Sequence, residues 1–86
     1  MNTTALLSER QTTHGDFTDN ARNGQMLRDA FRSSQAWARM PDLHREALDQ
    51  IAGKLSRILS GQSTYADHWQ DIAGYATLAL MGCDKK

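Results

Sequence analysis

Apolar residues recur along most of the chain at steps of three or four, the spacing that places side chains on one face of an α-helix. β-Branched residues are sparse, and one proline, Pro41, interrupts the sequence. The pattern therefore predicts an all-α protein, folded as a compact bundle of about four helices.

Two of these helices are predicted on either side of the stretch THGDF. The first spans about residues 3–13. Gly15 tolerates the turn that ends it, and Asp16 caps the second helix. The second helix either continues through RSSQAWARMP or bends at Ser33 and Ser34. Its apolar stripe consists of Phe17, Ala21, Gly24, Leu27 and Phe31.

A third helix is predicted between Pro41 and Gly61. The residue before a proline avoids the α region, so Pro41 ends the preceding helix. Asp42 can cap the third helix, and Gly61 supplies its end. The apolar stripe of this helix consists of Leu48, Ile51, Leu55, Ile58 and Leu59.

The fourth predicted helix begins after Ser63 or Thr64 and has two occupied sectors. Its core sector consists of Trp69, Ile72, Ala73, Ala76, Ala79 and Leu80. His68, Asp71 and Tyr75 lie on another sector, at steps of three and four residues, so they can contact each other or one ligand. Either Asp71 and Tyr75 are structural, with the tyrosine ring packed at a subunit boundary, or the row lines a pocket.

The 86 residues form one domain, residues 1–86, because so short a chain has no room for two cores. The last predicted helix carries more apolar surface than a small bundle covers, and such a patch usually marks an interface. We therefore expect homo-oligomerisation, as a dimer or larger assembly, to complete the bundle.

The formal net charge is zero, which argues against binding to duplex DNA through a dense basic surface but leaves a local basic pocket open. The single cysteine, Cys83, fits a reducing compartment. The sequence shows no signal peptide and no apolar run long enough to span a membrane. These features predict a location in the cytoplasm, without a membrane partner.

Two groups of residues are candidates for binding an anion. Lys54 and Arg57, in the stretch GKLSRI, are three residues apart on a helix and suit a phosphate or carboxylate. Arg10, His14 and Asp16 surround the predicted turn in ERQTTHGDF. Weak surface ion pairs would explain the first group without a ligand, and a helix end followed by an N-cap would explain the second.

Catalytic and metal-binding patterns are missing from the sequence. The three histidines lack metal-ligand spacing, and one cysteine does not make a zinc site. There is no nucleophile-and-base pattern and no glycine-rich phosphate loop. No catalytic residue, metal ligand or cofactor is therefore assigned.

The stretches HGDFTDNA, GKLSRI and HWQDIAGYATLAL, in this order, resemble a family of small phage and prophage proteins of unassigned function. The resemblance extends from about Arg10 to Leu80. That family is distantly similar to the all-α MazG-like nucleoside triphosphate pyrophosphatases, whose four-helix units form dimers or larger oligomers around Mg²⁺. Those enzymes carry an ExxE pair and a later ExxD pair. Here the later pair reads His68-x-x-Asp71, and Glu46-x-x-Asp49 stands for the earlier one.

The resemblance implies a phage-encoded protein that binds a nucleotide or another phosphorylated ligand without turnover and acts on host defence or the nucleotide pool. Arg10, His14, Lys54 and Arg57 would contact phosphate, and Tyr75 would stack on a base. Asp71 would orient a donor, with His68 beside it. One alternative is a protein–protein inhibitor that docks on a host enzyme through Trp37 and Arg39. The other is a weak pyrophosphatase, which would need Mg²⁺.

Overall fold

The computed structural model describes residues 11–83, which are almost entirely helical. The elements are α2 (Phe17–Ser33), the 3₁₀ turn η1 (Trp37–Arg39), α3 (Asp42–Ser60) and α4 (Ala66–Cys83). This confirms the all-α prediction. Residues 11–14 are also helical, and the rest of the predicted first helix lies outside the described residues. No helix of the described part is long and apolar enough to cross a membrane.

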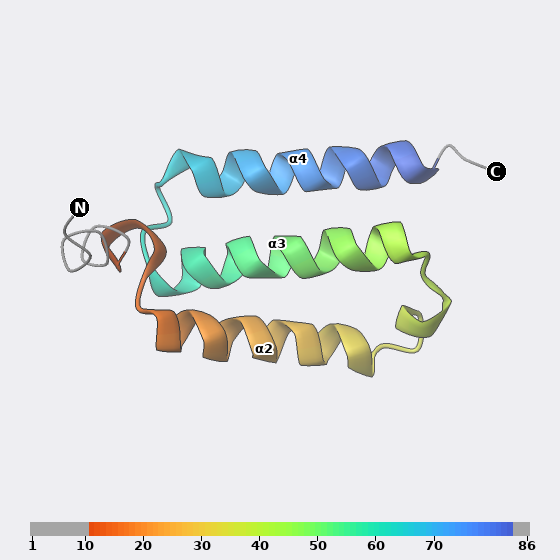
Figure 1. Cartoon of the computed structure of the whole chain (residues 1–86), viewed down its shortest axis with the longest axis horizontal. Coiled ribbons are helices and arrows are strands. Elements are labelled where there is room, and N and C mark those ends of the chain that lie inside the picture. The colour runs from red at the N-terminus through yellow and green to blue at the C-terminus, as the bar shows by residue number, and fades with distance from the viewer. Residues whose placement is uncertain (1–10, 84–86) are drawn as a thin grey trace, which may run out of the picture.

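The three long helices lie side by side in one layer, with α3 in the middle (Figure 1). Helix α2 packs along one side of α3, and α4 packs along the other. Successive helices run in opposite directions, so the short connections lie at alternate ends of the layer. A layer of this kind leaves its two broad faces without helices of the described chain over them.

The layer buries few apolar side chains. Among residues 11–83, only Ala47 and Ala52 are buried hydrophobic residues. The predicted stripe of α3 is therefore wrong as a core, because Leu48 and Leu55 are only half-buried and Leu59 is exposed. Residues between neighbouring helices are covered, whereas these leucines point from the middle helix towards one broad face. Small residues occupy the buried positions because two helices approach α3 closely from opposite sides.

The predicted core sector of α4 is also divided. The turns that face α3 carry His68, Ile72, Tyr75 and Ala79, all buried or half-buried. Trp69 and Leu80, predicted to lie in the core, are more than half exposed. Each helix of the layer contacts only one or two neighbours, so part of the broad apolar sector remains open.

The connection between α2 and α3 bends at Ser33, as one of the two predictions had it. The Trp37 ring stacks on Phe31 with centroids 6.0 Å apart, and the Arg32 guanidinium lies 4.9 Å from the centre of the same ring. Arg45 donates a hydrogen bond from Nε to the Trp37 carbonyl oxygen at 2.9 Å. Trp37, which the inhibitor alternative would use to dock on a host enzyme, therefore packs at this corner within the chain itself.

Helix boundaries follow local signals with two corrections. Helix α4 begins at Ala66, so neither Ser63 nor Thr64, the predicted caps, directly precedes it. Pro41 is the N-cap of α3, and Asp42, predicted as the cap, is the first helical residue. Proline fixes its own backbone at an angle suited to this position, and it leaves the acidic side chain in the first turn, where the helix dipole favours it. Gly61 caps the end of α3, as predicted.

The HGD turn joins the start of α2 to the ends of the other two helices. Gly15 has a φ of 81°, in the region that glycine adopts without strain. The Thr13 carbonyl oxygen accepts hydrogen bonds from the Gln62 amide at 3.2 Å and from His68 Nε2 at 2.9 Å. The Asp16 carboxylate accepts a hydrogen bond from the Thr18 amide at 3.1 Å, which confirms the predicted N-cap.

Candidate functional site

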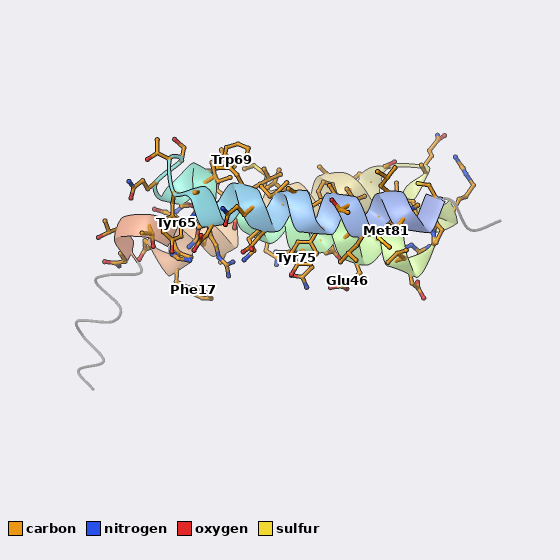
Figure 2. All side chains as sticks on the ribbon, turned by 90° about the horizontal axis from the view of Figure 1, so that it is seen from above. Phe17, Glu46, Tyr65, Trp69, Tyr75 and Met81 are labelled. Carbon is orange, nitrogen blue, oxygen red and sulfur yellow. The ribbon has the colours of Figure 1, made fainter. Side chains whose placement is uncertain are left out.

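The two faces of the layer differ in chemistry. Seen along the layer, Phe17, Glu46 and Tyr75 project from one face and Trp69 projects from the other (Figure 2). We call the first the polar face and the second the apolar face. Helical spacing places Lys54 and Arg57 of α3 with Glu46 on the polar face. The residues predicted to meet a phosphate on α3 therefore share the side that carries Tyr75.

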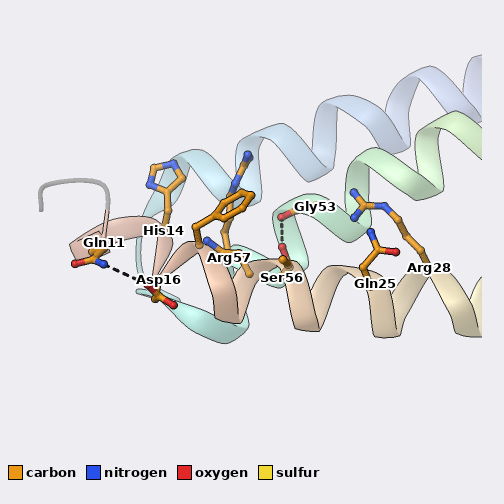
Figure 3. Close-up of a pocket in the computed structure, with 11 residues that line it drawn as sticks. Gln11, His14, Asp16, Gln25, Arg28, Gly53, Ser56 and Arg57 are labelled. Carbon is orange, nitrogen blue, oxygen red and sulfur yellow. Dashed lines mark hydrogen bonds between the residues drawn. The ribbon is translucent and has the colours of Figure 1, made fainter. Parts of the chain in front are cut away.

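A cavity of about 620 Å³ opens on the polar face between α2 and α3. Its volume falls within the range of about 300–1,000 Å³ typical of small-molecule sites. In Figure 3, His14, Asp16 and Arg57 lie towards one end and Gln25 and Arg28 towards the other. The complete lining is Gln11, His14, Asp16, Phe17, Asn20, Ala21, Gln25, Arg28, Gly53, Ser56 and Arg57.

Arg28 lies in the groove because each of the two helices carries a glycine, which has no side chain, beside its guanidinium. A Cβ atom on Gly24 would stand 2.9 Å from Nη1 of Arg28, and one on Gly53 would stand 3.3 Å from Nη2. The guanidinium donates a hydrogen bond from Nη2 to the Asp49 carbonyl oxygen at 3.0 Å. Two glycines on facing helices thus hold a cation at the wall of the cavity.

The positive charge of Arg28 is only partly neutralised. Its Nε lies 3.9 Å from Asp49 Oδ1, whereas Nη2 of Arg32 lies 2.9 Å from Asp49 Oδ2. One carboxylate therefore serves two guanidinium groups, and the shorter pair belongs to Arg32. The cluster keeps a net positive charge next to the cavity.

Arg57 is the second cation of the cavity. Among the described residues, its guanidinium has no ion pair and no hydrogen bond. The phenyl ring of Phe17, predicted as part of the apolar stripe of α2, is 82% exposed and lines the same cavity. Phe17 stands at the first position of α2, where α3 is already ending, so no helix covers the ring. The carboxylate of Asp16, also in the lining, is engaged by the cap described above.

Lys54 and Asp71 form an ion pair between α3 and α4, with 2.9 Å between Nζ and Oδ2. The Lys54 hydrogen bond, and then its charge, lower the pKa of the Asp71 carboxyl below its ordinary value of 3.8. The charges of His68 and Arg57 act in the same direction. Asp71 and Tyr75 also line a second, shallower hollow, together with Gln70, Gly74 and Leu78. The structure thus joins two predicted site residues directly.

Asp71→Asn is expected to lower stability at neutral pH and to lose this effect in acid. Because the folded-state pKa is lowered, the charged carboxylate contributes stability above pH 3.8, and the contribution disappears as pH falls through the folded value. Melting temperatures of wild type and variant should therefore differ near about pH 7 and converge near about pH 2. A gap of the same size at both pH values would contradict the stabilising role of the pair.

His68 has a different place from the one predicted. Its side chain is 1% exposed, so it does not share an open face with Asp71 and Tyr75. Because a carbonyl oxygen only accepts, Nε2 of His68 carries the proton that is donated to Thr13. The ring packs edge-on against His14, with centroids 4.9 Å apart. His68 therefore supports His14 from beneath, where α4 turns inward to meet the HGD turn.

The acidic pairs of the MazG-like comparison do not come together in the described part of the chain. Asp49 is engaged by the two arginines, and Glu46 accepts a hydrogen bond from Gln50 at 2.8 Å. Within residues 11–83, no group of three or more His, Cys, Asp or Glu side chains is placed to hold a metal ion. Arg10 lies outside the described residues.

Sequence reasoning missed Arg28 and gave Phe17 the wrong environment. The signal for Arg28 was weak, because its two glycine neighbours lie on different helices. Gly24 and Gly53 are 29 positions apart in the sequence, and only the packing of the helices brings them together. The cavity is lined by two guanidinium groups, of Arg28 and Arg57, and by the exposed aromatic ring of Phe17. Comparison of the chain with protein-family models, with curated proteins and with solved structures finds no match.

Proposed function

We propose that this protein binds a nucleotide or another phosphorylated small molecule in the polar-face cavity, without turning it over. The observation that carries the proposal is the pair of arginines, Arg28 and Arg57, on one cavity of suitable volume. Arginine presents planar donors that match phosphate oxygens in pairs. The Arg57 guanidinium acts on the charge of Asp71 but has no ion pair and no hydrogen bond among the described residues, so a ligand phosphate would supply a direct partner.

The remaining lining suits the other parts of a nucleotide. The exposed ring of Phe17 offers a flat apolar surface on which a base can stack, a contact worth about 1–3 kcal/mol for single-stranded nucleic acids. Gln25 presents an amide that both donates and accepts hydrogen bonds. Tyr75 keeps its proposed stacking role only for a ligand that reaches the second hollow. The Lys54 ammonium, paired with Asp71 beside that hollow, would add positive charge for the ligand there.

The biological setting follows from the resemblance and is part of the proposal. A phage-encoded binder of this kind would sequester a nucleotide signal of host defence or a member of the nucleotide pool. Binding without turnover is supported by the engagement of Asp49, because the carboxylate that would hold Mg²⁺ in a pyrophosphatase is paired with Arg28 and Arg32.

We also propose that the bundle of about four helices is completed by self-association. The support is the small core, since Ala47 and Ala52 are the only buried hydrophobic residues of the described chain. A short chain with so little buried apolar surface is expected to be marginally stable alone. A homo-oligomer would cover more of that surface.

Arg57→Gln is expected to weaken binding of a nucleotide at least about tenfold, or about 1.4 kcal/mol, because it removes a charge-assisted hydrogen bond. The matched control is Arg22→Gln. Arg22 lies on the outer side of α2 in an exposed pair with Asp19, so the same charge change there should leave affinity unaltered. Isothermal titration of nucleoside mono-, di- and triphosphates, with and without Mg²⁺, measures both variants.

The same samples test turnover, because chromatography separates the added triphosphate from a monophosphate product. The proposal predicts saturable binding with no product. Equal losses of affinity in the two variants would show general charge attraction, and a Mg²⁺-dependent monophosphate would establish the enzyme alternative instead.

A further inference from the structure

The apolar face carries two parallel seams of uncharged residues. On α3 the seam consists of positions 48, 52, 55 and 59, and on α4 of positions 69, 73, 76 and 80. Both follow steps of four, three and four residues, the spacing of a helix that packs against other helices. All eight residues are apolar, whereas Lys54, Arg57 and Asp71 lie on the opposite face.

Except at Ala52, which is buried, the seam positions are at least partly exposed in the single chain. Leu59, Trp69 and Leu80 are 63%, 51% and 65% exposed. The indole N–H of Trp69 already donates to the Ser63 carbonyl oxygen at 2.7 Å, so the ring presents only apolar surface. Exposure of such a surface to water is unfavourable, because the removal of apolar area from water lowers the free energy.

The size of the face matches a stable interface. Helices of 17 to 19 residues rise about 27 Å at 1.5 Å per residue, and three of them side by side at 8–10 Å spacing span about 30 Å. The broad face of all three helices therefore offers about 800 Å², close to the area that each partner buries in a standard interface, and the two seams form its apolar part.

We propose that a second copy of this chain stacks on the apolar face, so that two three-helix layers form a six-helix sandwich about a twofold axis. The face combines the large side chains of Leu55 and Leu59 on α3 with the small side chains of Ala73 and Ala76 on α4, a combination that lets two copies of the face interdigitate. This inference gives the proposed self-association a surface. It leaves the cavities facing outward on both sides of the dimer, so it stands or falls independently of ligand binding.

Sedimentation equilibrium of the full chain tests the surface with two exposed leucines. Leu59→Arg is expected to raise the dimer dissociation constant at least about a hundredfold, because it places a charge on the apolar seam of the interface. Leu78→Arg is the matched control, since Leu78 is 54% exposed on α4 but lies beside Asp71 and Tyr75 in the polar-face hollow. It should remain dimeric, at twice the 9.6 kDa chain mass.

Ala76→Glu is a second interface variant. It tests the same surface if the Leu59→Arg protein fails to fold. Glutamate favours helix, and Ala76 is exposed in the single chain, so only the second copy should be displaced. A folded monomer by circular dichroism and sedimentation supports the inference. A monomeric wild type would overturn self-association itself. A dimer that survives Ala76→Glu, or that only Leu78→Arg disrupts, would overturn this face alone.

Discussion

Gly15→Ala should unfold the HGD turn and lower the stability of the whole protein by about 3 kcal/mol or more. The φ of 81° disfavours any side chain, and a Cβ atom would collide with the backbone carbonyl of Ser60 at the end of α3. The backbone has no room to retreat, because a Cβ on Gly61 would lie only 2.6 Å from the Gly15 nitrogen. Melting followed by circular dichroism should show a drop of tens of degrees or no folded state at all.

Gly74→Ala provides the control for the same chemical change. Gly74 lies within α4, and apart from the neighbouring backbone of its own helix nothing lies within 4 Å of the position that its Cβ would take. Alanine is favoured over glycine in a helix by about 0.5–1 kcal/mol, so this variant should be slightly more stable than wild type. A Gly15→Ala protein that melts like Gly74→Ala would show that the close approach of the HGD turn to α3 is not required.

His68→Ala is expected to cost about 3 kcal/mol, because it opens a cavity under the HGD turn and removes a buried hydrogen bond. The 1% exposed ring contacts His14 and Tyr65, and its N–H is donated to Thr13. Urea unfolding measures the difference in free energy.

His68→Gln separates the hydrogen bond from the filled space. The glutamine amide can donate to Thr13, so this variant should recover part of the lost stability. Gln70→Ala, at an exposed position on the same helix, should behave like wild type. If His68→Ala unfolds within about 0.5 kcal/mol of wild type, as a surface substitution does, the supporting role of His68 beneath the cavity is wrong.

Local signals in the sequence predicted most of the helix boundaries. Asp16 and Gly61 act as the predicted cap and stop because each depends on only a few neighbouring residues. The apolar stripes were also located correctly on their helices. The error concerned what covers them, because periodicity identifies an apolar face and not its partner. Leu59 and Trp69 read as core residues for this reason, although no helix of the described chain covers them.

The sequence identified individual residues of the candidate site but not how the fold arranges them. Lys54 and Asp71 were both predicted to bind a ligand. Their pairing with each other depends on the register of two antiparallel helices. His68 follows the same spacing as Asp71 and Tyr75, but it lies in the first turn of α4, where it is buried beside the HGD turn and bonded to Thr13. Arg28 required the packing of Gly24 against the third helix, which no local pattern contains.

Nitrogen–proton NMR shift titration of the labelled full chain with nucleoside mono-, di- and triphosphates tests ligand binding most directly, because it locates the ligand. The proposed function predicts saturable shifts at the cavity, at the amides of Gln25 and Gly53 and the side chain of Arg57, with Ala76 on the apolar face unchanged. The Arg57→Gln protein should require at least about tenfold more nucleotide for the same shifts. Absence of saturable shifts across the nucleotides, or shifts confined to the apolar face, would contradict the assignment of the cavity.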